Sequence, residues 1–234
     1  MTNTDRNEEI DLIDEVFASV IPKFHEAHDI MVSLLDFPQA QKVRIADLGS
    51  GFGAFSTRIF NVLPSATLFA IDRNKDILER TRKRLPNEVT DQYIPFLRDL
   101  NDKAWMHELD SLDAVLSSFT LDFLTLERHE ELIHEAYHLL NPQGRWISCE
   151  FFRTEDNRIN RVFHEIEIRY VQNEMKAGNV DKEQIDRMAK SNLLRQQHHV
   201  CTVGEKMEWM RKAGYQQIEI PWKFLNLAVI SGVK

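Results

Sequence analysis

The sequence predicts an α/β fold built on a mostly parallel sheet that ends in an antiparallel hairpin. Short apolar segments alternate with helical segments from residue 43 to residue 152, which indicates parallel strand–helix–strand units. The apolar segments lack strict alternation of polar and apolar residues, as is typical of strands covered on both faces. The last two strand-like segments are joined so closely that they must pair antiparallel. We therefore expect seven strands in one sheet.

Two helices are expected before this sheet. Apolar residues at helical spacing from residue 9 onward predict the first helix, and Pro22 ends that run. The second helix is expected at 26–35. Because the pattern changes after Pro38, we divide the chain into N-terminal cover helices at 1–38 and a main domain at 39–234.

The main domain alternates strands and helices before a helical insertion interrupts it. Strands are expected at 43–48, 66–72, 94–98, 112–118 and 144–152, and helices at 54–63, 75–85 and 130–140. The alternation then stops, and helical segments at 158–175 and 182–194 predict an insertion over about 155–200 that forms a lid. The remaining segments are a helix at 204–213 and strands at 215–222 and 224–233, with the hairpin turn at Trp222 and Lys223.

The composition indicates the cellular compartment in which the protein is expected. With 43% hydrophobic and 28% charged residues, the chain can build a core without disulfide bonds. Its two cysteines favour a reducing compartment and offer no metal-ligand spacing. The polar first residues differ from a signal peptide, and no apolar run approaches the roughly 18 residues that cross a bilayer. We expect a cytoplasmic protein without a bound metal or membrane contact.

The net charge of −8 disfavours a nucleic-acid substrate, because such proteins present concentrated basic surfaces. The nearest basic cluster, at 79–85, lies on a predicted amphipathic helix, where its charges are expected to face solvent. A small molecule is therefore the expected partner. The oligomeric state stays open, with a homodimer as one option.

A glycine-rich loop between the first strand and the first helix predicts the ligand site. Glycines let such a loop adopt positive φ and approach a ligand beyond the carboxyl ends of the strands. Gly49, Gly51 and Ala54 formally satisfy the dinucleotide pattern G-x-G-x-x-G/A. Asp47 argues against that pattern, because a carboxylate is a poor neighbour for a pyrophosphate and a good one for an amino group or a sulfonium. Alternatively, Asp47 accepts hydrogen bonds from the loop's own amides.

Two further acidic residues follow the next strands. Asp72 ends the second strand at the spacing of a carboxylate that binds ribose hydroxyls, and a helix N-cap is its alternative role. Asp99 follows the third strand, where it could accept a hydrogen bond from an adenine amine with Leu100 packed beside the ring. A plain loop position is the alternative for Asp99. Together these residues indicate a nucleoside ligand.

The segment "DLGSGFG" resembles the D/E-x-G-x-G-x-G motif of class I S-adenosylmethionine-dependent methyltransferases. "AIDRN", "AVLSSFTLDFL" and "LLNPQGRWI" are similar to further motifs of that family, in the family's order. The N-terminal helices also resemble those of small-molecule members, with Phe24 where a tyrosine is usual. The resemblance implies a Rossmann-like sheet, S-adenosyl-L-methionine as cofactor and a small-molecule methyl acceptor. The expected cofactor residues are Asp47, Gly49, Ser50, Gly51, Gly53, Asp72, Arg73, Asp99, Leu100 and Ser117.

The acceptor site is less well defined by the sequence. By the resemblance it lies over the fourth and fifth strand ends, and its candidates are Thr120, Asp122, Glu150, Phe152, His164, His198 and His199. We take Glu150, His198 and His199 as catalytic candidates, because carboxylates and imidazoles accept protons. Pairing of Glu150 with an arginine such as Arg153 is equally open.

Three other functions compete with methyl transfer. The chain also resembles carboxy-S-adenosylmethionine synthases, whose product needs a basic side chain, for which Arg195 is the candidate. A non-catalytic S-adenosylmethionine-binding module would keep the loop without turnover. A nicotinamide-dependent oxidoreductase is favoured by Ala54 and disfavoured by Asp47.

Overall fold

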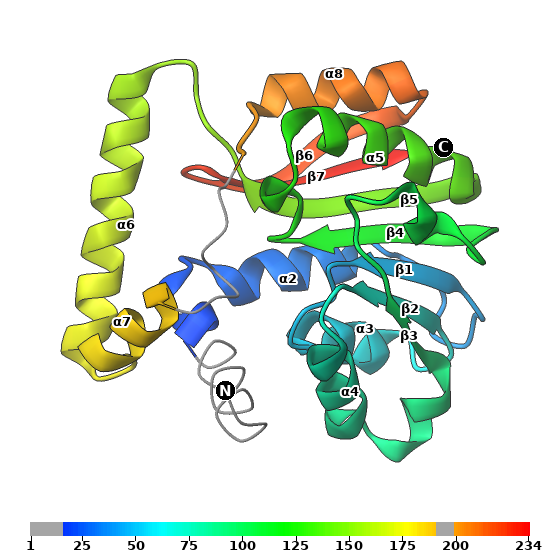
Figure 1. The fold of residues 1–234 in the computed structure, drawn as a ribbon. Coiled ribbons are helices and arrows are strands. Elements are labelled where there is room, and N and C mark those ends of the chain that lie inside the picture. The colour runs from blue at the N-terminus through cyan, green and yellow to red at the C-terminus, as the bar shows by residue number, and fades with distance from the viewer. Residues whose placement is uncertain (1–15, 191–198) are drawn as a thin grey trace.

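The computed structural model of the 234-residue chain describes residues 16–190 and 199–234 (Figure 1). In these residues one seven-stranded sheet has the order β3-β2-β1-β4-β5-β7-β6. The strands are β1 (Arg44–Leu48), β2 (Thr67–Asp72), β3 (Tyr93–Leu97), β4 (Leu112–Ser118), β5 (Leu140–Phe151), β6 (Gln216–Phe224) and β7 (Leu227–Val233). Strand β7 runs antiparallel to both of its neighbours, and the other pairs are parallel. The predicted α/β architecture is confirmed.

Helices cover both faces of the sheet (Figure 1). One face packs against α2 (Phe24–Ser33), α3 (Ala54–Val62) and α4 (Lys75–Arg84), and the other against α5 (Leu126–Leu139) and α8 (Val203–Ala213). Neighbouring residues of β1 pack on opposite faces of the sheet: Ile45 belongs to the core beneath α2, α3 and α4, and Ala46 to the core beneath α5 and α8. This double coverage explains why the strands lack polar alternation.

The sheet reverses its strand order between β1 and β4, because the chain moves outward from β1 to β3 and then returns to β1's other side. At such a reversal the loops after neighbouring strands diverge and leave a crevice at their carboxyl ends. Short 3₁₀ helices lie in these connections: η1 (Asn87–Gln92), η2 (Lys103–Met106) and η3 (Leu121–Phe123). The crevice therefore forms where the glycine-rich loop leaves β1.

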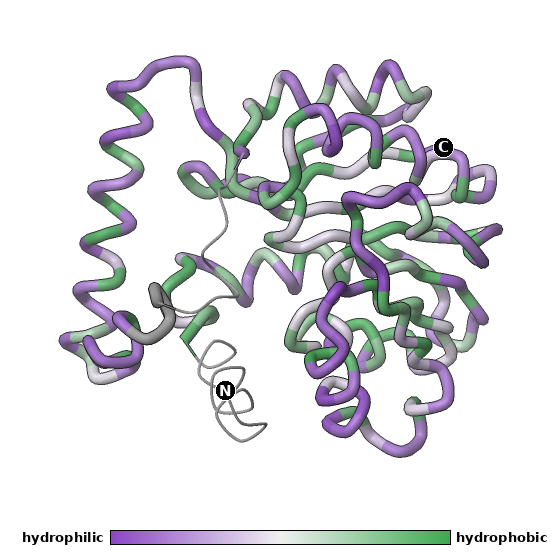
Figure 2. Tube along the Cα trace, viewed as in Figure 1, coloured by the Kyte–Doolittle hydropathy of each residue, from purple (hydrophilic) through white to green (hydrophobic). Residues whose placement is uncertain are grey.

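The predicted insertion is helical and consists of α6 (Asn157–Ala177) and α7 (Lys182–Lys190). Helix α6 stands apart from the sheet, with α7 at its lower end (Figure 1), and none of its residues is buried. Figure 2 shows hydrophobic and hydrophilic residues alternating along this helix. In the connection between α6 and α7, Val180 packs against Val16 of the N-terminal segment. The role of this insertion as a lid stays a prediction.

Several boundaries differ from the expectation: β5 begins at Leu140 rather than at residue 144, and two further differences have a clear cause. Helix α5 begins a turn early, because Thr125 caps it by accepting a hydrogen bond from the Arg128 amide. The hairpin turn expected at Trp222 and Lys223 is wrong: β6 continues to Phe224, which pairs with Leu227. Leu225 takes the positive φ of 53° that a tight turn needs, and no glycine marks this position in the sequence.

Parts of the predicted elements fall outside the described residues. These are the first helix before residue 16 and the end of the second insertion helix at 191–194. In the ranges that are described, no helix combines the length and the apolar composition that crossing a bilayer requires.

Candidate functional site

A cavity of about 220 Å³ lies at the carboxyl ends of β1 to β4 and is closed on one side by α2. All predicted cofactor residues except Ser117 line it: Asp47, Gly49, Ser50, Gly51, Gly53, Asp72, Arg73, Asp99 and Leu100. Ser117 is fully buried instead, and its hydroxyl donates a hydrogen bond to the Leu48 carbonyl at 3.2 Å. Ser117 thus joins β4 to β1 beneath the cavity, and its neighbour Ser118 lines the wall.

The three glycines of the loop serve different purposes. All have positive φ, at 71° for Gly49, 51° for Gly51 and 81° for Gly53. A Cβ on Gly49 would overlap the Thr120 side chain, and one on Gly53 would overlap that of Thr81. A Cβ on Gly51 would meet only the Gly49 carbonyl oxygen, at 3.7 Å. Packing within the fold therefore accounts for two of the glycines, and only Gly51 faces open space.

Asp47 lies at the end of β1 with 1% of its surface exposed. Its Oδ2 accepts no hydrogen bond of good geometry within the described ranges, although the Ser56 hydroxyl lies close to the carboxyl. The buried Oγ of Ser50 in the same wall likewise lacks a bond of good geometry, with the Tyr93 hydroxyl as its neighbour. Burial, reinforced by the charge of Asp72, raises the pKa of Asp47 to about 7. Since buried polar atoms are normally paired, these two atoms are suited to a ligand that supplies donors.

Asp72 ties the glycine-rich loop to the end of β2. Its Oδ2 accepts a hydrogen bond from the Gly51 amide at 3.0 Å, and its Oδ1 accepts one from the Asn74 amide at 2.8 Å. The N-cap of α4 is Asn74, whose side chain accepts from the amides of Asp76 and Ile77. The alternative role of Asp72 as that cap is therefore wrong. Burial raises the pKa of the Asp72 carboxyl despite these bonds.

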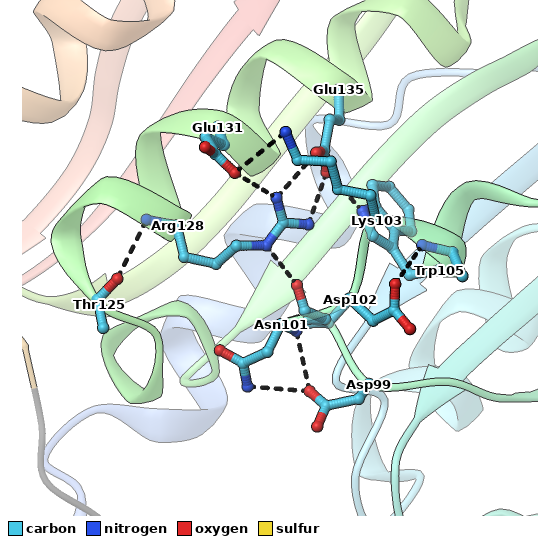
Figure 3. A network of polar contacts seen from close by, with 11 residues as sticks. Asp99, Asn101, Asp102, Lys103, Trp105, Thr125, Arg128, Glu131 and Glu135 are labelled. Atoms are coloured by element: carbon cyan, nitrogen blue, oxygen red, sulfur yellow. Dashed lines mark hydrogen bonds and ion pairs between the residues drawn. The ribbon is translucent and has the colours of Figure 1, made fainter.

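The loop after β3 is held by a polar network that begins on α5 (Figure 3). The Asp99 Oδ1 accepts hydrogen bonds from the backbone and side-chain nitrogens of Asn101, both at 2.9 Å. The Leu100 carbonyl accepts one from Arg128 Nε at 2.7 Å. The guanidinium of Arg128 also forms two bonds with Glu135, at 2.8 and 2.7 Å, and Glu135 in turn accepts from the Trp105 indole at 2.7 Å.

Arg128 was not among the sequence candidates, although it fixes the segment expected to hold an adenine. It lies one helical turn from Glu131 and two from Glu135, and acidic residues at that spacing are a signal of a shared helix face. The bidentate contact with Glu135 orients the guanidinium so that its Nε points to Leu100. The position of the Asp99 loop therefore depends on α5.

Another part of the cavity wall is aromatic and includes a buried histidine. Phe17, Phe24 and Phe119 line it together with His28, which is 2% exposed. The His28 Nε2 lies 2.6 Å from Ser118 Oγ at the end of β4. Burial, with the charges of Arg58 and His25, lowers the pKa of His28 to about 3, so this ring is neutral. Nothing in the sequence distinguishes His28 from a core histidine.

Glu150, the main catalytic candidate, does not line the cavity. It is 1% exposed and forms an ion pair with the fully buried Lys206 of α8, with 2.9 Å between Oε1 and Nζ. His129 lies 3.7 Å from its other oxygen. Burial raises the pKa of Glu150 to about 7 against the attraction of Lys206. The suggested pairing with Arg153 is wrong, because Arg153 pairs with Glu205 at 2.8 Å.

The remaining acceptor candidates are scattered. Thr120 lines the cavity, and its hydroxyl lies within hydrogen-bond distance of the Gly49 and Ser118 carbonyls. The His199 amide donates to the Asp122 carbonyl at 2.6 Å outside the lining, and His164 is exposed on α6. Phe152 is buried in the core. His198 and Arg195 lie outside the described residues. Within those residues, no group of three or more metal-ligating side chains is found.

The chain is similar in sequence to a protein family and to individual curated proteins. A family model described as a methyltransferase domain matches residues 45–144. The chain is also similar to a carboxy-S-adenosyl-L-methionine synthase of Nautilia profundicola, with 22% identity over 223 residues that cover 95% of this chain and 91% of the relative. The family match spans the four parallel strands whose ends form the cavity.

Solved structures show the same fold. The apo structure of the S-adenosylmethionine-dependent methyltransferase SibL matches with a TM-score of 0.60 and 19% identity, over 90% of this chain and 56% of that one. Human N-acetylserotonin methyltransferase in complex with SAM matches with a TM-score of 0.57 and 14% identity, over 95% of this chain and 59% of that one. This chain thus spans little more than half the length of those structures.

The buried carboxyl of Asp47 predicts a pH dependence of stability. Its pKa is about 7 in the folded protein against an ordinary value of 3.8, so between these values the folded state binds more protons than the unfolded state. The free energy of unfolding contributed by Asp47 therefore falls as pH rises through this window. We expect Asp47→Asn to flatten that fall and to raise the free energy of unfolding above pH 7, measured by urea denaturation across pH.

The exposed carboxylate of Asp91 provides the control for a change of one charge. Asp91→Asn is expected to leave the pH profile of stability unchanged. If Asp47→Asn and the parent protein lose stability in parallel as pH rises, the carboxyl of Asp47 is not held protonated by burial.

Proposed function

Because this chain has the class I S-adenosylmethionine-dependent methyltransferase fold and similarity to carboxy-S-adenosylmethionine synthases, we propose that it transfers a methyl group from S-adenosyl-L-methionine to a small molecule. One observation carries the proposal. The open space above Gly51 adjoins the Oδ2 of Asp47, which accepts no hydrogen bond of good geometry in the described residues, at the point where the strand order reverses. A cationic nucleoside fits both the space and the charge.

Different residues of the cavity would bind different parts of the cofactor. Asp47 would receive the amino group, and two oxygens of Asp72 would receive the ribose hydroxyls while still holding the loop, since a carboxylate offers about four acceptor sites. Asp99 and Leu100 would receive the adenine. The lining contains the carboxylates that can accept hydrogen bonds from a cationic nucleoside. The described lining residues form no metal-ligating cluster.

When bound, S-adenosylmethionine would supply a methyl group activated on a sulfonium, which an acceptor's lone pair could displace with the C–S electron pair staying on sulfur. The chain's own contribution is alignment and exclusion of water. Phe24 and Phe119 close the aromatic part of the cavity wall, and each is at most 7% exposed. The Thr120 side chain packs on Gly49 and sets the distance between that wall and the loop.

A second candidate function is synthesis of a carboxylated S-adenosylmethionine, favoured by the similarity to a relative of that name over 91% of the relative's length. An added carboxylate needs a cationic partner. Within the described lining, the lysine and arginine side chains are Arg73 and Arg98, which follow β2 and β3. These positions are at the expected adenosine end of the cavity. Arg195, the candidate cation for this role, lies outside the described residues, so this second function keeps its own test below.

Isothermal titration with S-adenosylmethionine, S-adenosylhomocysteine and NAD⁺ tests the ligand class. We expect micromolar dissociation constants for the two sulfur nucleosides and no binding of NAD⁺, because the ionised form of Asp47, which a cationic ligand favours, repels a pyrophosphate. Binding of NAD⁺ alone would replace the proposal with a dinucleotide-dependent function. Binding of the nucleosides without turnover of any acceptor would favour the non-catalytic module.

Substitution of two glycines tests the position of the ligand. Gly51→Ala places a methyl group in the open space, so we expect S-adenosylmethionine to bind about tenfold or more weakly, the effect of overfilling a packed site. Gly49→Ala is the matched control, because its methyl group meets Thr120 and should lower the melting temperature more than Gly51→Ala does. Unchanged affinity of Gly51→Ala would place the ligand elsewhere.

Mass spectrometry of the nucleoside released from freshly purified protein separates the two candidate reactions. We expect S-adenosylmethionine or S-adenosylhomocysteine, because the described wall holds no cation beside the expected position of the methyl group. A nucleoside heavier by the mass of carbon dioxide would instead favour the carboxylated product.

A further inference from the structure

The cavity has one charged side and one aromatic side. Its charged lining residues all belong to the ends of β1, β2 and β3 or to the loops that follow them: Asp47, Asp72, Arg73, Arg98 and Asp99. The lining from α2 and from the segment after β4 contains no aspartate, glutamate, lysine or arginine in the described ranges. If the proposed function holds, the nucleoside takes the charged side, and the reaction partner must enter the aromatic side.

The aromatic side is arranged for a flat ring. Phe24 and Phe119 are stacked, with ring centroids 5.5 Å apart and planes 16° apart. Phe17 stands edge-on to both, with centroid distances of 6.1 Å to each. Offset stacking and edge-to-face contacts at these separations are the geometries that aromatic groups prefer. A further aromatic ring in the cavity would therefore meet the faces and edges that this cluster leaves uncovered.

One polar pair interrupts this aromatic side. Ser118 is partly exposed and lines the cavity, and its Oγ lies 2.6 Å from Nε2 of the neutral His28. A hydroxyl has one donor and two acceptor positions, so the contact with His28 leaves Ser118 Oγ free for a second hydrogen bond. The His28 ring is itself fixed by stacking on Phe55, at 4.8 Å between centroids. His28 therefore orients the Ser118 hydroxyl.

From this division of the cavity we infer that the acceptor is an uncharged, flat aromatic molecule whose hydroxyl or amino group bonds to Ser118. Its ring packs against Phe24 and Phe119. His28 acts as a positioning residue through Ser118. A carboxylate or phosphate on the acceptor would meet an apolar wall without a cation in its described part, and burying an unpaired charge is unfavourable. The inference rests on the proposed function, because it assigns the charged side to the nucleoside.

Ligand-observed NMR with the S-adenosylhomocysteine-loaded protein tests the inference with four probes of similar shape: phenol, aniline, toluene and benzoate. We expect phenol and aniline to bind more tightly than toluene, and benzoate to bind least. Ser118→Ala should weaken phenol binding about three- to tenfold, the effect of losing one hydrogen bond, and leave toluene binding unchanged. A merely structural effect of the substitution would weaken both.

Two further variants complete the experiment. His28→Phe keeps an aromatic ring in place and should weaken phenol binding while the affinity for S-adenosylhomocysteine is retained. Ser33→Ala makes the same substitution as Ser118→Ala on the exposed side of α2 and should change neither affinity. Benzoate binding as tightly as phenol, or equal losses of phenol and toluene in Ser118→Ala, would overturn the inference. Failure of S-adenosylhomocysteine to bind at all would overturn the proposed function with it.

Discussion

The hydrogen bonds of the Asp72 carboxylate fix the geometry on which the candidate site depends. One oxygen holds the Gly51 amide, and the other holds the amide of Asn74, which caps α4. The glycine-rich loop, the end of β2 and the start of α4 are thus joined at a single side chain. Because Asp72 is partly buried, these bonds are stronger than they would be in water. The floor of the cavity is therefore formed before any ligand arrives.

The cavity combines parts that differ in how firmly they are held. Thr120 packs on Gly49, and Arg128 bonds to Leu100, so the loops after β1, β3 and β4 are each anchored to another element. The Asp47 carboxyl is different, because it is buried without a hydrogen bond of good geometry to Oδ2 in the described residues. Its environment disfavours the charged form that would best bind a cation. A cationic ligand would restore that charge, so binding and ionisation are coupled at this residue.

Most of the fold could be predicted from the sequence, because hydrophobic periodicity and strand–helix alternation depend on local residues. The charged side of the cavity was also predictable, since Asp47 and Asp72 stand at strand ends that parallel topology brings together, with Gly51 in the loop after the first of them. Contacts between segments that are distant in the sequence could not be predicted. No local signal shows that Glu150 meets Lys206, 56 residues away, or that His28 meets Ser118, 90 residues away.

The same limit explains the misplaced hairpin turn and the packing role of two loop glycines. Leu225 adopts positive φ because strand pairing on both sides requires a turn there, and a leucine gives no sign of it. Gly49 and Gly53 are required by Thr120 and Thr81, which lie far from them in the sequence. Density of glycines in a loop therefore overstates how many of them face a ligand.

The separation of α6 from the sheet has a consequence for how this protein can diversify. With no residue of α6 buried, substitutions along it change little of the energy that holds the seven strands together. The glycine-rich loop and its supports lie in the two covered layers and tolerate few changes. Selection can therefore alter the surface that α6 presents without disturbing the seven-stranded sheet or the cavity at its strand ends.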